Sequence, residues 1–322
     1  MSKLLTVAIP TYNRKKYLEK ALQSIYSQFD ERLEVLVSDN CSEDGTQNFV
    51  IANYPDVVYY RNEENVGMEN FKRCYDRARG DFILLLGDDD IIVDGTIKII
   101  LDFLQNNKDV SLVFLNHSFF KDEFDGTIDR PFASIHNGNF VTTSKDRFIN
   151  IVRHQLTLIS CMILSREAYL RIEKPERYVK NWFLQTCVEF EATKEVGAKL
   201  GIISDICVAQ NLPQSNVSFN MDVYVEVFVL TEQKVFEEIG VNCGYKKKQM
   251  RKIYSDFICK NLPIYILSCK AKNISWKEPF WRKAYPALKR YPRVWVTIMP
   301  AALTPSWLAK MLYIVKHRIM RK

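Results

Sequence analysis

The chain has 322 residues, of which 47% are hydrophobic, which is enough for one large domain with an appendage or for two domains. Its net charge of +7 is unevenly distributed: residues 241–322 contain 19 basic and two acidic residues, a balance of +17, whereas residues 1–240 carry a balance of −10. The eight cysteines form no CxxC pair, no segment has the roughly 20 apolar residues of a transmembrane helix, and no signal peptide precedes the first strand; we therefore expect a cytoplasmic protein with reduced thiols.

Strands and helices are predicted to alternate in the first part of the chain. Apolar runs predict strands at Leu4–Ile9, Leu33–Val37, Val57–Tyr60 and Phe82–Leu86. Apolar residues at helical spacing predict helices at residues 17–25, 46–52 and 67–79. This alternation is typical of an α/β fold with a mostly parallel sheet, whose ligands bind beyond the carboxyl ends of the strands.

Three consecutive aspartates, Asp88, Asp89 and Asp90, follow the predicted strand Phe82–Leu86. Adjacent carboxylates repel one another and resist burial, so such a triplet persists where a cation neutralises it. Thr11 and Asp39 follow two other predicted strands, and we expect them at the same edge of the sheet. The alternative interpretation of the triplet is a solvated acidic turn.

Four segments resemble, in order and spacing, the signatures of family 2 glycosyltransferases with the GT-A fold. They are VAIPTYNR (Val7–Arg14), VSDNCSEDGT (Val37–Thr46), RNEENVG (Arg61–Gly67) and GDFILLLGDDD (Gly80–Asp90). The resemblance extends over about the first 115 residues and is absent after about residue 220. It implies a Rossmann-like GT-A catalytic domain over residues 1–220, a mostly parallel sheet flanked by helices, followed by a basic, aromatic-rich helical region over residues 221–322.

The resemblance also implies a nucleotide-sugar site. The residues that it assigns to this site are Pro10, Thr11, Tyr12, Asp39, Arg61, Asn65, Gly67 and Asp88. In this assignment Asp39 accepts a hydrogen bond from the base, and Tyr12 either stacks on the nucleotide or packs beside the sheet. Arg61 or Asn65, with Gly67, approaches the diphosphate, although Gly67 is also explained as an ordinary turn glycine.

A divalent metal ion is implied at the acidic triplet. Asp89 is the first choice as a direct ligand, with Asp90 as a ligand or neighbour and Asp88 near the ribose or the metal. Oxygen ligands suit Mg²⁺ or Mn²⁺, and such an ion stabilises the departing nucleoside diphosphate. The more frequent form of the family has an aspartate where this chain has Gly87.

Inverting transfer further requires a general base for the acceptor hydroxyl. The resemblance places this base in the stretch Asn181–Gly197, which contains Glu189, Glu191 and Glu195. Glu189 is favoured over Glu191, although each glutamate taken singly is better explained as a solvated helix charge than as the base, and the Glu-Asp pair usual in the family is missing. In a helix, Glu191 and Glu195 would share one face.

Two further groups of residues have weaker interpretations. The segment Gln210–Phe219 is rich in turn formers, and Asn211 and Ser215 either contact the sugar or belong to a polar surface loop. The histidines His117, His136 and His154 show no metal-ligand spacing, so we interpret them as structural.

The C-terminal region combines basic residues with four of the five tryptophans, which favours contact with an anionic membrane surface. A helix is predicted to begin at Thr304-Pro305, and its apolar residues share one side. These are Trp307, Leu308, Met311, Leu312, Ile314, Val315 and Ile319. The alternatives are docking on the catalytic domain, pairing of subunits, and binding of RNA; no nucleic-acid motif accompanies the basic residues, so we expect no nucleic-acid partner.

Together these features predict a metal-dependent, inverting glycosyltransferase, peripheral on the inner face of the plasma membrane. The expected donor is a UDP-sugar, and the expected acceptor is a lipid-linked glycan of a bacterial surface polysaccharide such as an O-antigen or capsule. A sugar-nucleotide nucleotidyltransferase is one alternative, although PTYNRKKY (Pro10–Tyr17) lacks the glycine-rich triphosphate loop. A non-catalytic nucleotide-sugar-binding protein is the other.

Overall fold

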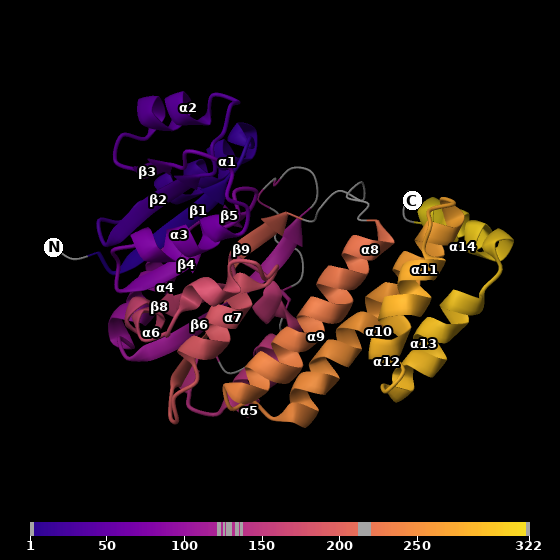
Figure 1. The fold of residues 1–322 in the computed structure, drawn as a ribbon. Helices are drawn as coiled ribbons and strands as arrows, with labels where there is room; N and C mark the ends of the chain where they lie inside the picture. Colours follow the sequence, from indigo (N-terminus) through magenta and orange to yellow (C-terminus); the bar gives the residue numbers. More distant parts are fainter. Residues whose placement is uncertain are drawn as a thin grey trace. The chain divides into compact units, whose positions relative to one another are not determined.

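The computed structural model of the chain describes residues 3–120, 124, 126, 131, 132, 135, 138–211 and 220–319, with the backbone alone for 314–319 (Figure 1). Its contacts divide the chain into two compact units. Unit 1 comprises Met1–Gln214 and Asn242–Gly244, and unit 2 comprises Ser215–Val241 and Tyr245–Lys322. The sequence predicts a division after residue 220, whereas in the structure residues 242–244 also belong to unit 1.

Unit 1 is built on one sheet of nine strands, in the order β3-β2-β1-β4-β8-β6-β9-β5, with β7 paired to β9. The strands are β1 (Leu5–Thr11), β2 (Leu33–Asp39), β3 (Val58–Arg61), β4 (Phe82–Leu85), β5 (Ile91–Ile92), β6 (Val110–Phe120), β7 (Phe140–Thr142), β8 (Met162–Ser165) and β9 (Lys199–Asn211). The helices are α1 (Lys15–Tyr26), α2 (Thr46–Asn53), α3 (Glu69–Arg77), α4 (Thr96–Asn106), α5 (Lys145–Val152), η1 (Arg153–Thr157), α6 (Arg166–Leu170), η2 (Pro175–Tyr178) and α7 (Leu184–Ala192).

The predicted α/β class is confirmed, and the parallel pairing holds for the first four strands. β1 pairs in parallel with both β2 and β4, and β2 pairs in parallel with β3. Beyond β4 the sheet is mixed, because β8 runs antiparallel to both β4 and β6, and β5 and β7 run antiparallel to β9. β6 and β9 are again parallel.

The core of unit 1 follows from the alternation of side chains along the strands. Val7 and Ile9 of β1 share one face of the sheet and belong to the same buried cluster as Leu18 and Leu22 of α1. On the other face, helix α3 packs against β1, β2 and β4, and helix α7 packs against β6 and β8 (Figure 1). In open α/β sheets, ligands bind beyond the carboxyl ends of the parallel strands, so this edge of the sheet is where a site is expected.

Unit 2 is helical, in agreement with the expected C-terminal region (Figure 1). Its elements are α8 (Met221–Tyr224), η3 (Val225–Thr231), α9 (Glu232–Lys234), η4 (Val235–Gly240), α10 (Lys247–Ala271), α11 (Lys277–Pro279), η5 (Phe280–Ala284), α12 (Tyr285–Leu288), α13 (Pro292–Leu303) and α14 (Ser306–Ile319). The long helix α10 packs against α13 and α14. Among the described residues, none of the helices has both the length and the apolar character needed to cross a membrane.

A buried lysine joins α10 to the end of α13. The Lys270 ammonium donates hydrogen bonds to the carbonyls of Ala301, Ala302 and Thr304 at 2.8, 2.8 and 2.6 Å. These carbonyls lie at the C-terminal end of α13, where helical carbonyls lack an intrahelical partner and the helix dipole favours a cation. Lys270 therefore caps α13 from a neighbouring helix.

Candidate functional site

Polar side chains from three neighbouring strands of unit 1 meet at the carboxyl edge of the sheet. Thr11, the last residue of β1, is in register with Asp39, the last residue of β2, and the turn that holds Asp88 follows β4. A pocket of about 340 Å³ opens at this edge. Its lining contains six predicted site residues, which are Pro10, Thr11, Tyr12, Gly67, Asp88 and Asp89. The lining also contains six residues that are not among the predicted site residues: Arg14, Asn40, Asn70, Phe71, Gly87 and Ile159.

Arg14 bridges the first two aspartates of the triplet. Its Nη1 lies 2.9 Å from Asp88 Oδ1, and its Nη2 lies 2.5 Å from Asp89 Oδ2. Thr11 Oγ1 donates a hydrogen bond of 2.8 Å to the other oxygen of Asp88. Burial raises the pKa of Asp88 to about 6, and the Arg14 charge opposes that rise. The two carboxylates are thus held side by side in the pocket by one cation.

Asp90 is directed away from the pocket. Its Oδ2 accepts a hydrogen bond of 2.5 Å from Ser160 Oγ, and its Oδ1 accepts one of 2.9 Å from the backbone N–H of Asn211. Burial raises the pKa of Asp90 to about 7. With a donor on each oxygen, Asp90 fastens the acidic turn to the segment before β8 and to the end of β9, so it is placed as a support for the turn rather than as an open metal ligand.

Gly87 lies against the carboxylate of Asp90. A Cβ at this position would lie 2.9 Å from Asp90 Oδ2, so a larger residue would require that carboxylate to shift. The Gly87 N–H also donates to Ser160 Oγ at 2.8 Å.

Asp39 is buried beneath the pocket rather than on its surface. The backbone N–H of Ser42 donates to its Oδ1 at 2.9 Å, and the Tyr59 hydroxyl donates to its Oδ2. The next residue, Asn40, lines the pocket instead, and its amide donates to Asn65 Oδ1 at 2.7 Å.

The predicted diphosphate residues occupy different environments. Gly67 lines the pocket at a φ of 58°, a left-handed conformation that favours glycine. Asn65 supports it, because the Gly67 N–H donates to Asn65 Oδ1 at 2.9 Å. Arg61 lines a second pocket, of about 260 Å³.

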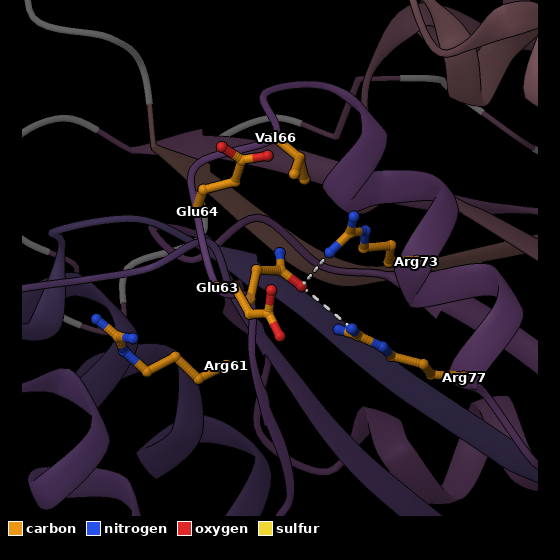
Figure 2. Close-up of a pocket in the computed structure, with 7 residues that line it drawn as sticks. Arg61, Glu63, Glu64, Val66, Arg73 and Arg77 are labelled. Atoms are coloured by element: carbon orange, nitrogen blue, oxygen red, sulfur yellow. Dashed lines mark hydrogen bonds between the residues drawn. The ribbon is translucent and has the colours of Figure 1, made fainter.

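The second pocket contains three arginines, two of which share one acceptor. Arg73 Nη1 and Arg77 Nη2 donate to Asn62 Oδ1 at 2.9 and 3.1 Å, as the dashed lines in Figure 2 show. Arg61 points away from this pair in the same view and donates to the carbonyl of Ser42 at 3.2 Å. Arg61 thus lies outside the lining of the pocket that holds Asp88 and Asp89.

The two candidate bases face different environments on helix α7. Glu189 is 2% exposed, its Oε2 has no partner among the described residues, and burial raises its pKa well above the usual range. Glu191 accepts hydrogen bonds from Arg177 at 2.7 Å and from the Tyr178 hydroxyl at 2.9 Å. Neither glutamate lines the pocket. Glu195 lies beyond the end of α7 and pairs with Arg171 at 3.5 Å.

Glu189 and Asp90 both act on the same buried thiol. Burial raises the pKa of Cys161, and the carboxylates of Asp90 and Glu189 raise it further. Helix α7 is also bonded to the segment before pocket residue Ile159, because Gln185 Nε2 donates to the carbonyl of Thr157 at 2.9 Å.

The remaining sequence interpretations concern residues away from the pocket. His117 is buried and stacks on Phe132 with ring centroids 5.0 Å apart, and burial lowers its pKa to about 4. His154 lies in η1, and Asn211 ends β9. His136 and Ser215 lie outside the described residues.

The donor set of the pocket fits a divalent ion that keeps open positions. Within the part of the chain that the structure describes, no group of three or more His, Cys, Asp or Glu side chains forms a complete metal site. Asp88 and Asp89 nevertheless present two carboxylates side by side in the pocket. Mg²⁺ typically takes one or two carboxylates from the protein and completes its coordination with water and substrate phosphates.

The site and the fold agree with comparisons to known proteins. The family described as Glycosyl transferase family 2 matches residues 6–171. The chain is 37% identical over 117 residues to Abequosyltransferase RfbV of Salmonella typhimurium, covering 34% of this chain and 35% of that protein. It is 31% identical over 134 residues to a GalNAc(5)-diNAcBac-PP-undecaprenol beta-1,3-glucosyltransferase of Campylobacter jejuni, covering 40% and 42%. The match thus spans well under half the length of these relatives.

Solved structures share the fold over nearly the whole chain at low identity. The structure of S. aureus TarS 1-349 in complex with UDP-GlcNAc superposes with a TM-score of 0.62 at 18% identity, covering 98% of this chain and 87% of that one. The mannosyltransferase PcManGT from Pyrobaculum calidifontis, in complex with GDP-Man and Mn²⁺, superposes with a TM-score of 0.54 at 16% identity, covering 97% and 88%.

Proposed function

Because this chain belongs to glycosyl transferase family 2 and has the GT-A fold, we propose that it transfers a sugar from a UDP-sugar to a hydroxyl group with inversion. The acceptor in this proposal is a lipid-linked glycan of a bacterial surface polysaccharide, reached from the inner face of the plasma membrane. The observation that carries the proposal is the pocket in which Thr11, Arg14, Asp88 and Asp89 meet at the carboxyl edge of β1 and β4.

This pocket supports the proposed nucleotide-sugar donor and divalent ion. Asp88 and Asp89 would hold Mg²⁺ or Mn²⁺, which when bound neutralises the diphosphate and stabilises the leaving nucleoside diphosphate. Thr11 fixes the orientation of Asp88, and Asp90 holds the turn from behind through Ser160 and the Asn211 N–H. Relatives bound to UDP-GlcNAc and to GDP-Man with Mn²⁺ support a nucleotide-sugar donor and a divalent ion.

We propose Glu189 ahead of Glu191 as the general base. Among the described residues, no donor reaches Glu189 Oε2, whereas Arg177 and Tyr178 both donate to Glu191. As an acid of raised pKa, Glu189 would have to gain exposure and lose its proton before it could accept one from the acceptor. Asp39, Asn40 and Gly67 are proposed to shape the nucleotide end of the pocket, the first as a buried support.

The proposed lipid-linked acceptor is supported by the name of one relative and by the charge of residues 241–322. The Campylobacter jejuni relative is named for a substrate on undecaprenol diphosphate, and residues 241–322 carry a balance of +17. A positive surface suits an acceptor carried in an anionic membrane.

The test is the thermal stability of the purified protein with UDP-, GDP-, dTDP- and CDP-linked sugars, first with Mn²⁺ and then with EDTA. We expect stabilisation by one nucleotide class, larger with Mn²⁺, since a ligand that binds only the folded state stabilises it. Asp89→Ala is expected to remove the metal-dependent part of this shift. An unchanged shift in the variant would place the ion elsewhere.

A second candidate function is favoured by the position of the two glutamates outside the pocket lining. A non-catalytic nucleotide-sugar-binding protein would show the same thermal shift. It would differ by releasing no nucleoside diphosphate when incubated with donor and lipid-linked acceptor, whereas the proposed transferase releases one per sugar transferred.

A further inference from the structure

Large hydrophobic side chains are concentrated on the exposed surface of unit 2. Among the described residues, seven exposed large hydrophobic side chains fall within residues 281–312, and the whole of 3–211 has the same number. Monomeric proteins rarely expose contiguous apolar patches without a binding role. Exposed large hydrophobic side chains are thus concentrated in the last helices of unit 2.

The centre of this surface is one face of helix α13. Val294, Ile298 and Ala301 are buried, at the helical spacing of a packed side. The opposite arc carries Trp295 and Val296, which are 51% and 74% exposed. In an α-helix, residue 303 returns to the same arc seven residues after Val296. Leu303 is 69% exposed, so the arc is apolar along the whole helix.

The apolar surface extends beyond α13 in both chain directions. Toward the N-terminal side, the ring of Tyr285 contacts both Trp281 and Trp295, with centroids 5.3 and 6.0 Å apart. Toward the C-terminal side, α14 begins three residues after Leu303 and exposes Trp307 and Met311, 65% and 55% accessible and one turn apart. We call the set Trp281, Trp295, Val296, Leu303, Trp307 and Met311 the tryptophan face.

The charge of unit 2 indicates which partner this face meets. Residues 241–322 carry a balance of +17, and the exposed Lys310 lies three residues after Trp307, on the same side of α14. A second copy of the chain would bring the same excess of positive charge against it. An anionic bilayer provides both an apolar phase for indole rings at the headgroup level and phosphates for lysines.

We propose that the tryptophan face binds the surface of an anionic lipid bilayer without crossing it. The inference deepens the proposed function, because a lipid-linked acceptor is presented at such a surface, but the face itself is independent of the donor pocket.

The test is co-sedimentation of the full chain with vesicles of phosphatidylcholine alone or with about one third phosphatidylglycerol. We expect binding to the anionic vesicles, weakened at high salt, and little binding to the neutral ones. The double variant W295S/W307S is expected to lower the affinity for anionic vesicles roughly tenfold or more, since both indoles leave the apolar phase. The matched control is Trp182→Ser, which removes an indole 49% exposed in unit 1 and should leave the affinity unchanged.

Three results would overturn the proposal. They are no binding of the wild type to anionic vesicles, equal loss in W182S, and a dimer in solution that W295S/W307S dissociates, which would assign the face to a second copy. Thermal shifts with UDP-sugars are measured on the same variants. Loss of vesicle binding with the donor shift retained separates this inference from the proposed function, and loss of the donor shift in the wild type would reject the latter alone.

Discussion

Arg14 lies where two carboxylates of the pocket would otherwise repel each other. It provides one cation for Asp88 and Asp89, which are also the proposed ligands of the divalent ion. A metal ion bound by these two aspartates would compete with the Arg14 guanidinium for the same oxygens, so metal binding would require Arg14 to give up at least part of its ion pairs. In the proposed reaction, the released guanidinium would be free to contact the donor diphosphate.

Arg14→Gln is therefore expected to strengthen binding of Mn²⁺ in the absence of nucleotide. The expected gain is about fivefold, because an ion pair with a half-exposed partner contributes about 1 kcal/mol or less. Isothermal titration with Mn²⁺ measures it directly. The control is Arg32→Gln, whose ion pairs join Asp30 and Asp102 instead. Unchanged Mn²⁺ affinity in R14Q would show that the ion does not use the Asp88 and Asp89 oxygens that Arg14 holds.

Glu189 makes the stability of the fold depend on pH. Its raised pKa means that the folded chain keeps this proton after the unfolded chain has lost it near pH 4.3. The folded state then binds more protons, so the free energy of unfolding falls as the pH rises toward the raised pKa. Glu189→Gln removes this dependence. We therefore expect the free energy of unfolding of E189Q, relative to that of the wild type, to be about 1–2 kcal/mol higher at pH 8 than at pH 5.

Urea unfolding of the wild type and E189Q at both pH values measures this difference. Glu191→Gln is the control, since it breaks a hydrogen-bonded ion pair and should destabilise the protein at both. If Glu189 is also the base, E189Q should lose transfer by at least about 100-fold while keeping the donor shift. Retained transfer would move the base to another residue.

At the scale of elements, the first four strands and their helices are predictable because each is a local pattern. The expected strand Leu33–Val37 is observed as β2, Leu33–Asp39, and the expected helix over residues 46–52 is observed as α2, Thr46–Asn53. The antiparallel position of β8 between β4 and β6 depends on pairing between distant segments, for which the chain carries no local signal.

The candidate site is predictable to the extent that it follows strand ends. Thr11, Asp88 and Asp89 are brought together as expected. The orientation of Asp90 depends on Ser160, seventy residues later, and the burial of Asp39 depends on Tyr59. Arg14 ends the motif VAIPTYNR, so the sequence predicts that it lies near the pocket. Its ion pair with Asp88 depends on the folding of distant segments and is seen only in the structure.

The cap that Lys270 provides for α13 is testable at the same scale. Lys270→Met removes a charged donor from three carbonyls, and we expect it to lower the free energy of unfolding by about 2 kcal/mol or more. Lys260→Met is the matched control on α10, because that side chain is exposed. Chemical denaturation of both variants measures the effect, and equal stabilities would show that water replaces the lysine at no cost.

At the scale of the whole molecule, the candidate site and the excess of positive charge lie in different units. The pocket belongs to unit 1, while the tryptophan face and the strongly basic segment belong to unit 2. The cysteines are distributed over both units. Seven of the eight cysteines are buried, and Cys41 alone is partly accessible.

Thiol labelling tests this distribution. Because the thiolate is the reactive form, burial that raises a thiol pKa, as it does to about 12 at Cys74, also slows labelling. We expect Ellman's reagent to label one thiol rapidly in the folded protein and all eight in denaturant. Cys41→Ser should abolish the rapid phase. Several rapid thiols in the wild type would contradict the packing described for the two units.

The cap at Lys270 has a consequence for the order in which the protein is made. Its three acceptors lie 31 to 34 residues further along the chain, so they leave the ribosome after α10 is complete. Until residues 301 to 304 have emerged, this ammonium lacks its three carbonyl acceptors. Domains generally fold as units from the N-terminus during synthesis. The strands of unit 1 are complete by Asn211 and its last segment is Asn242–Gly244, so unit 1 is synthesised before the last helices of unit 2.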